Sequence, residues 1–154
     1  MKLEMKILID ADACPVVNIT EKIAKREKLP LVLICDTSHI IHSNYGKVIV
    51  VDRGKDSADF KLVCETAKGD IVVTQDYGVA AMILGKGAYA IHQSGMWYTK
   101  DNIDQMLFER HLSKKARRGS SHYNGKGLKR RTMEDNERFD VSLQKMIAAA
   151  KSST

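Results

Sequence analysis

The chain has 154 residues, a hydrophobic content of 44% and a net charge of +6. A chain of this length is most simply one domain with a single core, so we expect residues 1–154 to form one domain. The basic balance favours an anionic partner. No run approaches the ~20 apolar residues that a membrane-spanning helix needs.

The expected compartment is the cytoplasm. The N-terminal segment MKLEMKILID carries an acid and too short an apolar run for a signal peptide. Cys14, Cys35 and Cys64 lack CxxC spacing, and they fit reduced thiols rather than a disulfide framework.

Short apolar runs alternate with helical patterns along the chain. The runs fit buried strands at residues 7–9, 31–35, 47–51, 70–74 and 88–91. Helices are predicted at residues 15–24, 56–69, 77–85, 100–118 and 132–150. Continuous apolar strands that alternate with helices are typical of an α/β protein with a mainly parallel sheet, covered on both faces. We expect about five strands in the order 3-2-1-4-5.

Acidic residues follow two of the predicted strands. Asp10 and Asp12 come directly after the first strand, and Thr74 and Asp76 end the fourth. In the order 3-2-1-4-5 these strands are neighbours at the point where the strand order reverses. Ligand sites of open α/β sheets form beyond such strand ends. We therefore expect the three carboxylates to converge in one crevice.

Two more acids, Asp56 and Asp59, lie at the start of the helix that precedes the fourth strand. They can face the same crevice, or they can simply cap the helix and interact with its dipole. Carboxylates gathered in one pocket repel one another unless some bind protons or a cation neutralises them. Oxygen ligands suit Mg²⁺ or Mn²⁺, so the pattern predicts a metal site. The predicted ligands are Asp10, Asp12, Asp56, Asp59 and Asp76.

Four motifs, in chain order, resemble the YaiI/YqxD family of uncharacterised bacterial proteins: DADACPV, DSADF, GDIVVTQDYGVAAMILGKGA and YTKDNID. That family is similar to PIN-like domains, which are metal-dependent nucleases. The resemblance implies a three-layer α/β/α sandwich that hydrolyses phosphodiester bonds with Mg²⁺ or Mn²⁺, in RNA rather than DNA. The catalytic residues that it implies are Asp10, Asp59, Asp76 and Thr74. PIN-like domains also have an acid in the middle of the chain, for which the candidates are Glu21, Asp36, Asp52 and Asp56.

A basic segment spans residues 110–131 without an Asp or Glu. Its nine Lys and Arg residues exceed the net charge of +6, so the rest of the chain is net negative. The segment joins a helix end to a flexible, Gly- and Ser-rich arm. We expect it to bind nucleic-acid backbone, although a basic run also suits a solvated helix end. The predicted contacts are Lys114, Lys115, Arg117, Arg118, Lys126, Lys129, Arg130 and Arg131.

Two other functions fit the same residues. One is a phosphatase in which Asp10 is the nucleophile and Asp12 the acid, with GDIVVTQD supplying a second acid pair. The other is a nucleic-acid-binding module without catalysis.

Other polar residues carry weaker expectations. Cys14 lies near a helix N-terminus, where the pKa of a thiol can fall. His39 and His42 show no metal-ligand spacing, and Trp97 and Tyr98 are expected to fill the core.

Overall fold

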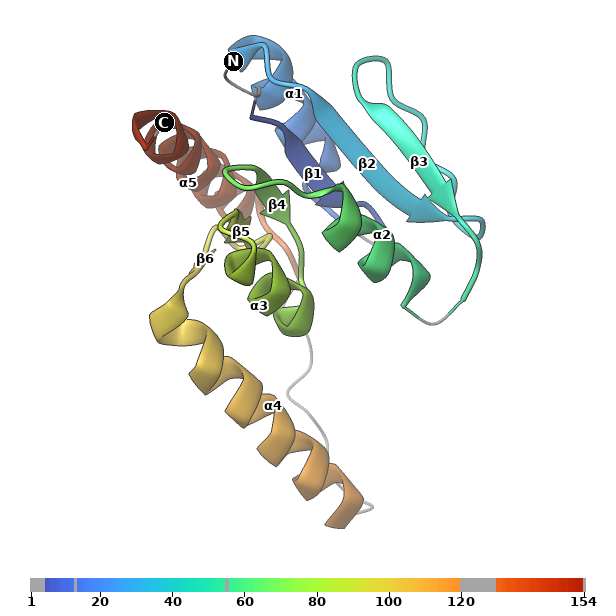
Figure 1. Ribbon diagram of the computed structural model, residues 1–154, viewed down its shortest axis with the longest axis vertical. Helices are drawn as coiled ribbons and strands as arrows, with labels where there is room; N and C mark the ends of the chain where they lie inside the picture. The colour runs from blue at the N-terminus through green and yellow to red at the C-terminus, as the bar shows by residue number, and fades with distance from the viewer. Residues whose placement is uncertain (1–4, 13, 55, 120–129, 154) are drawn as a thin grey trace.

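The structure is a computed structural model that describes residues 5–12, 14–54, 56–119 and 130–153 (Figure 1). Its strands are β1 (Ile7–Asp10), β2 (Leu31–Asp36), β3 (Lys47–Val51), β4 (Ile71–Val73), β5 (Tyr89–Ile91) and β6 (Trp97–Tyr98). Its helices are α1 (Val17–Glu27), α2 (Ser57–Glu65), α3 (Tyr77–Gly85), α4 (Lys100–Gly119) and α5 (Met133–Ser152). None of the helices in these ranges is long and apolar enough to cross a membrane.

The strands form one sheet in the order β3-β2-β1-β4-β5-β6. The first five are parallel, which confirms the predicted order 3-2-1-4-5. β6 is an additional antiparallel strand, because the chain turns back at Gly95 and pairs Tyr98 with Ala90. Its two residues are too few to produce an alternating pattern in the sequence. Tyr98 is buried, as expected for a core residue.

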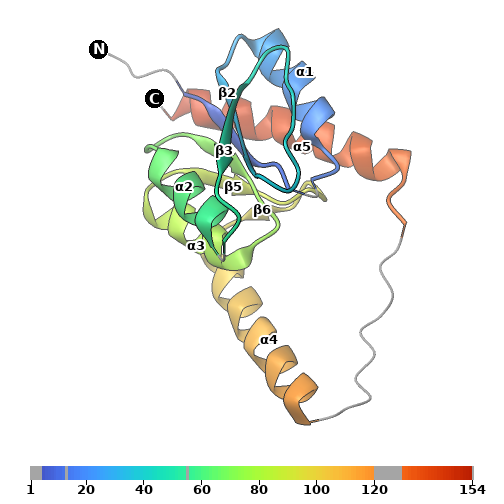
Figure 2. The same cartoon turned by 90° about the vertical axis from the view of Figure 1, so that its right-hand side faces the viewer.

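Helices cover both faces of the sheet, so the architecture is a three-layer α/β/α sandwich. One core lies between the sheet and α1 and α5, and includes Ile7, Ile9 and Phe139. The other lies between the sheet and α2, α3 and the start of α4, and includes Leu8, Leu62 and Ile83. Figure 2 shows the two helical layers on opposite sides of the strands.

α2 ends four residues earlier than its predicted end at Gly69. It ends at Glu65, where the following residue, Thr66, is already extended. The Thr66 hydroxyl donates to the Leu62 carbonyl at 2.7 Å, and the N–H of Ala67 donates to the carboxylate of Asp70 at 2.8 Å. These side-chain hydrogen bonds replace the helical pattern at its C-terminal end.

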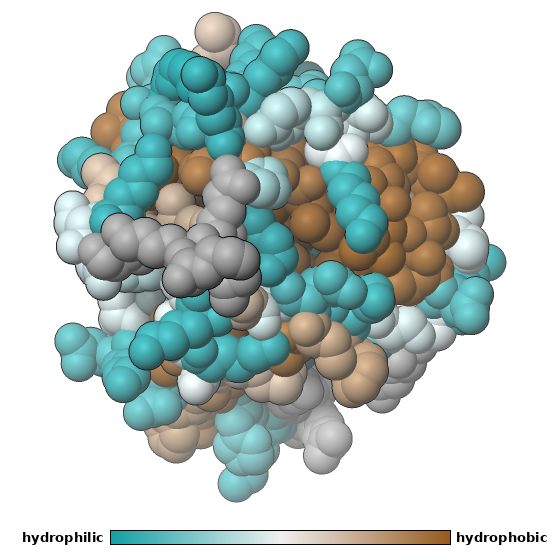
Figure 3. All heavy atoms as spheres, turned by 45° about the horizontal axis from the view of Figure 1, so that its top comes forward, coloured by the Kyte–Doolittle hydropathy of each residue, from teal (hydrophilic) through white to brown (hydrophobic). Residues whose placement is uncertain are grey.

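β3 is an edge strand with partial cover. Its side chains are exposed or half-buried, and Val50 is 43% exposed. An apolar area lies on the right of Figure 3, the side of the molecule that carries β2 and β3 in Figure 1. The buried centre of the sheet is therefore β1 and β4, the strands whose ends carry the predicted site.

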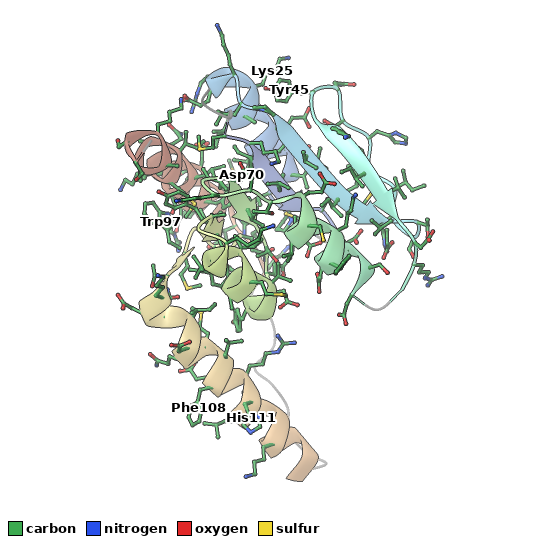
Figure 4. All side chains as sticks on the ribbon, in the orientation of Figure 1. Lys25, Tyr45, Asp70, Trp97, Phe108 and His111 are labelled. Carbon is green, nitrogen blue, oxygen red and sulfur yellow. The ribbon has the colours of Figure 1, made fainter. Side chains whose placement is uncertain are left out.

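Asp70 fixes the opposite, amino-terminal end of the sheet (Figure 4). It is 2% exposed, and its Oδ2 lies 2.6 Å from Lys6 Nζ. The same carboxylate accepts a hydrogen bond from the Lys6 N–H at 3.2 Å and from the Ala67 N–H at 2.8 Å. Asp70 thus joins the residue before β1 to the turn before β4.

Removal of this carboxylate should destabilise the fold strongly. Asp70→Ala leaves the half-buried Lys6 ammonium and two backbone N–H groups without their acceptor, so we expect the free energy of unfolding to fall by about 2–4 kcal/mol. Urea denaturation measures this change. Glu65→Ala is the control, because it removes an exposed i,i+4 ion pair with Lys61 and should change stability little. Equal losses in both variants would contradict a special role for Asp70.

Candidate functional site

The carboxyl ends of β1 and β4 form the floor of the candidate site. Ile9 pairs with Val73, so Asp10 and Thr74 follow at the same level on neighbouring strands, as predicted. Alternation along β1 directs Asp10 to the face of Leu8, which α2 and α3 cover. The amino ends of both helices lie at this same edge of the sheet (Figure 1).

Asp76 is held at the amino end of α3. Its Oδ1 accepts hydrogen bonds from the N–H groups of Gly78, at 2.8 Å, and Val79, at 3.2 Å. Its own N–H donates to Thr74 Oγ1 at 3.1 Å, and Thr74 is buried. The positive end of a helix dipole stabilises a carboxylate in this position. Thr74 and the first turn of α3 therefore fix Asp76 at the edge of the crevice.

Carboxylates from three elements share one electrostatic field. Burial raises the pKa of Asp10 from 3.8 to about 6, and repulsion from Asp59, Asp12 and Asp76 adds to this rise. Burial also raises the pKa of Asp59, in the first turn of α2, and repulsion from Asp76 adds to the effect. Like charges shift each other's pKa only when they are close. Asp10, Asp12 and Asp76 line one crevice, and the charge of Asp59 acts on the same group, as their sequence positions suggested.

Asp56 lies beside this group at the start of α2. Its backbone is left-handed, with φ 67° and ψ 6°, and its side chain makes no capping hydrogen bond. The interpretation of Asp56 as a capping side chain is therefore wrong. Its charge contributes to the raised pKa of Asp59, after burial and the charge of Asp76, so it adds to the negative potential.

A crevice of about 450 Å³ lies over these strand ends, lined by Asp10, Asp12, Gln75, Asp76, Tyr77 and Arg110. Arg110 comes from α4, and its Nη1 lies 3.6 Å from Asp76 Oδ1. In the sequence Arg110 stands out only as part of the basic segment, and its place in the crevice was not predicted. Helical spacing was the available signal, because Arg110 lies seven residues, about two turns, after the buried Ile103.

Asp12 connects the crevice to a second set of side chains at the end of β2. Its two carboxylate oxygens lie 3.3 and 3.2 Å from the Asp36 N–H that donates to them. Asp12, Asp36 and His39 offer ligand atoms that all lie within 4.8 Å of one another, close enough to hold one metal ion. Within the described part of the chain, no other group of His, Cys, Asp and Glu is as tight.

His39, whose spacing in the sequence showed no metal-ligand pattern, thus belongs to a group that could hold a metal ion. A turn after β2 places it there, because the N–H of Ser38 donates to Asp36 Oδ1 at 2.7 Å and the N–H of His39 donates to the Asp36 carbonyl at 3.3 Å. Asp36 was one of four candidates for the mid-chain acid, and it is the one that lies beside Asp12 in this group.

The basic segment is described only in part. The side chains or whole residues outside the description are Lys114, Arg117, Arg118, Lys126 and Lys129. Lys115 and Arg130 are exposed. Arg131 donates from Nε to Asn136 Oδ1 at 2.7 Å and from Nη2 to the Gln93 carbonyl at 2.9 Å. It therefore attaches the start of α5 to the loop between β5 and β6.

Cys14 does not have the lowered pKa that its position near a helix suggested. Burial raises the pKa of its thiol, because a thiolate in this half-buried place loses hydration. Cys14 packs against the core that includes Ile7 and Ile9, and its raised pKa gives no support for a reactive thiolate.

The raised pKa of Asp10 predicts a pH-dependent stability. A carboxyl that titrates near 6 when folded and near 3.8 when unfolded stabilises the fold most below about pH 4, and this contribution is lost as the pH rises through 6. Asp10→Asn removes a charge that is both buried and repelled by its neighbours, so at neutral pH it should raise the free energy of unfolding by about 1–3 kcal/mol. Urea denaturation at several pH values measures the difference from the wild type, which should vanish near pH 4.

The exposed Asp104 of α4 provides the matched control. Asp104→Asn removes an equal charge away from the crevice and should show no such pH-dependent gain. A constant difference between Asp10→Asn and the wild type across this pH range would contradict the raised pKa of Asp10.

Comparison with known proteins finds relatives that match nearly the whole chain. The family model described as "Uncharacterized BCR, YaiI/YqxD family" matches residues 8–149. UPF0178 protein CA_C2825 of Clostridium acetobutylicum is 56% identical over 147 residues, which cover 96% of this chain and 99% of that protein. A UPF0178 protein of Lachnoclostridium phytofermentans is 49% identical over 149 residues, which cover 96% and 100%.

Among solved structures, the crystal structure of Rae1 (YacP) from Bacillus subtilis is similar, with a TM-score of 0.45 and 11% identity over 97% of this chain and 99% of that chain.

Proposed function

This chain belongs to the YaiI/YqxD family, and from the geometry of its crevice we propose that it is a nuclease that hydrolyses phosphodiester bonds with Mg²⁺ or Mn²⁺. The observation that carries the proposal is that Asp10, Asp12 and Asp76 line one crevice, with the charge of Asp59 acting on Asp10 from α2. Their mutual repulsion opposes folding, so a cation that neutralises them stabilises the folded protein.

The donor set fits a hard divalent cation. Carboxylate oxygens of Asp10, Asp59 and Asp76, with Asp12 beside them, are the ligands that Mg²⁺ and Mn²⁺ prefer. The neighbouring group that includes His39 adds a nitrogen, which suits Mn²⁺ better than Mg²⁺. When bound, such a cation polarises the phosphodiester and lowers the pKa of the attacking water.

The side chains of the protein position and charge the site. The first turn of α3 and Thr74 hold Asp76 in place. The N–H of Asp36 holds Asp12. The carboxylate of Asp10, with a pKa of about 6, can accept a proton near neutral pH in the cation-free protein.

The substrate that we propose is nucleic acid. The negative crevice repels phosphate by itself, so a positive flank is needed beside it, and the basic segment supplies one. Lys115 and Arg130 are its exposed, described members. The preference for RNA over DNA rests on the resemblance to PIN-like domains.

The phosphatase alternative has less support. Asp10 and Asp12 both line the crevice, but Asp70 from the proposed second acid pair lies at the opposite end of β4 and is bound to Lys6. No lysine is among the described residues that line the crevice. The cleavage assay described next distinguishes the proposed nuclease from a module that binds nucleic acid without cleaving it.

Calorimetric titration with Mn²⁺ and a cleavage assay on single-stranded RNA test the proposal together. We expect the wild type to bind Mn²⁺ and to cleave RNA only in its presence. Asp10→Asn and Asp76→Asn should each weaken Mn²⁺ binding by about tenfold or more, because each removes a charged ligand.

The matched control is again Asp104→Asn, which should retain wild-type binding and cleavage. Mn²⁺ binding without cleavage would leave the non-catalytic module. Equal Mn²⁺ affinity in the wild type and in both site variants would contradict the proposed metal site.

Replacement of His39 distinguishes between the two proposed sets of metal ligands. His39→Ala should leave Mg²⁺ affinity within about twofold of the wild type, because the proposed Mg²⁺ ligands are the oxygens of Asp10, Asp59 and Asp76. A separate magnesium titration of the variant measures this. A loss of Mg²⁺ binding would move the principal ion to the group of Asp12, Asp36 and His39.

A further inference from the structure

Arg110 is the single positive charge among the described residues that line the crevice. Its guanidinium lies over the amino end of α3, where a Cβ atom on Gly78 would be 4.0 Å from Nη1. Its charge also acts on Asp59, so it faces two of the proposed metal ligands. A crevice built to hold a cation thus contains a protein cation beside its acids.

The contact between Arg110 and Asp76 is loose. The distance of 3.6 Å is too long for a hydrogen bond, and the arginine side chain is 43% exposed. Asp76 does not depend on this partner, because two backbone N–H groups of α3 already bind the same oxygen. Arg110 can therefore leave Asp76 without exposing a carboxylate that lacks donors.

α4 fixes where Arg110 can reach. The start of the helix is anchored by Ile103, which is buried, and by Leu107, which packs against the same core. Further along, Phe108 and Leu112 are 61% and 48% exposed. Figure 4 shows Phe108 and His111 on the part of α4 that extends past the body of the protein. Arg110 thus lies near the end of the anchored stretch.

We propose that Arg110 binds the substrate's phosphate, and that it exchanges Asp76 for this phosphate when a divalent cation neutralises the crevice. This inference rests on the proposed function, because it assigns a phosphate contact to the same site. A guanidinium suits the role, since it binds phosphate oxygens through two parallel N–H groups. No other cationic side chain among the described residues lines this crevice.

Two consequences distinguish Arg110 from an ordinary surface cation. Without a divalent ion the carboxylates compete with phosphate for Arg110, so it contributes less to nucleic-acid binding. With the ion it is released and binds phosphate. Arg110 also competes with the ion for Asp76, so its removal should strengthen ion binding in the absence of nucleic acid.

The experiment compares Arg110→Gln with the wild type by Mn²⁺ calorimetry and by fluorescence anisotropy of a short, phosphorothioate-linked single-stranded RNA. In Arg110→Gln we expect Mn²⁺ affinity to rise roughly two- to fivefold, the effect of one exposed ion pair. We expect RNA affinity to fall about tenfold with Mn²⁺ present, and only about two- to fivefold with a chelator present, because Asp76 then competes with phosphate for the guanidinium. The salt slope with Mn²⁺ should flatten by about 0.7.

Lys115→Gln is the matched control, because Lys115 is exposed on α4 beyond the crevice. It should weaken RNA binding equally with and without Mn²⁺ and leave Mn²⁺ affinity unchanged. Arg110→Lys keeps the charge and should restore part of the Mn²⁺-dependent RNA affinity. Circular dichroism of each variant checks that α4 stays folded.

The outcomes separate the inference from the proposed function. A wild type that binds Mn²⁺ and RNA, with an Arg110→Gln variant that matches it in both, overturns the role of Arg110 alone. An equal loss of RNA affinity with and without Mn²⁺ also overturns it, because Arg110 would then be a surface contact. A wild type that binds neither Mn²⁺ nor RNA overturns both proposals.

Discussion

Repulsion between carboxylates at one edge of the sheet is the constraint on which the structure of this site depends. Asp10 follows Ile7, Leu8 and Ile9, which are fully buried at the centre of the sheet, so its position is set by the core and not by its charge. Its pKa of about 6 shows that burial and the neighbouring acids destabilise its charged form. Hydrophobic burial supplies much more free energy than this repulsion removes, which allows the fold to hold like charges together.

Hydrogen bonds and one arginine at the same edge of the sheet partly offset the negative charge of these carboxylates. The amino end of α3 donates two N–H groups to Asp76, and the N–H of Asp36 binds Asp12. Arg110 adds a partly exposed positive charge from α4. Each of these contacts fixes or partly neutralises one acid, and the crevice of about 450 Å³ stays open beside them.

The sequence predicted the sheet and the convergence of Asp10, Asp12 and Asp76 on one crevice, because both follow from strong patterns. Buried strands give continuous apolar runs, parallel connections are right-handed, and together they place Asp10 beside Thr74. Asp76 lies beside this pair, and Asp59 reaches the same field from α2.

Features that depend on local turns or on distant packing were not predictable in this way. His39 reaches Asp12 through a turn whose hydrogen bonds leave no periodic pattern. β6 is too short to show alternation, and hydrogen bonds from Thr66 and to Asp70 end α2 before its glycine. Arg110 was counted with the basic segment because composition dominates there, whereas its place in the site follows from how α4 packs against α3.

A crystal of the protein soaked in Mn²⁺, examined by anomalous scattering, tests the metal site most directly. Manganese gives an anomalous signal that identifies the ion without reference to activity. We predict a Mn²⁺ peak in contact with the carboxylates of Asp10 and Asp76. An empty crevice at saturating Mn²⁺, or a peak bound only by Asp12, Asp36 and His39, would contradict the site as described.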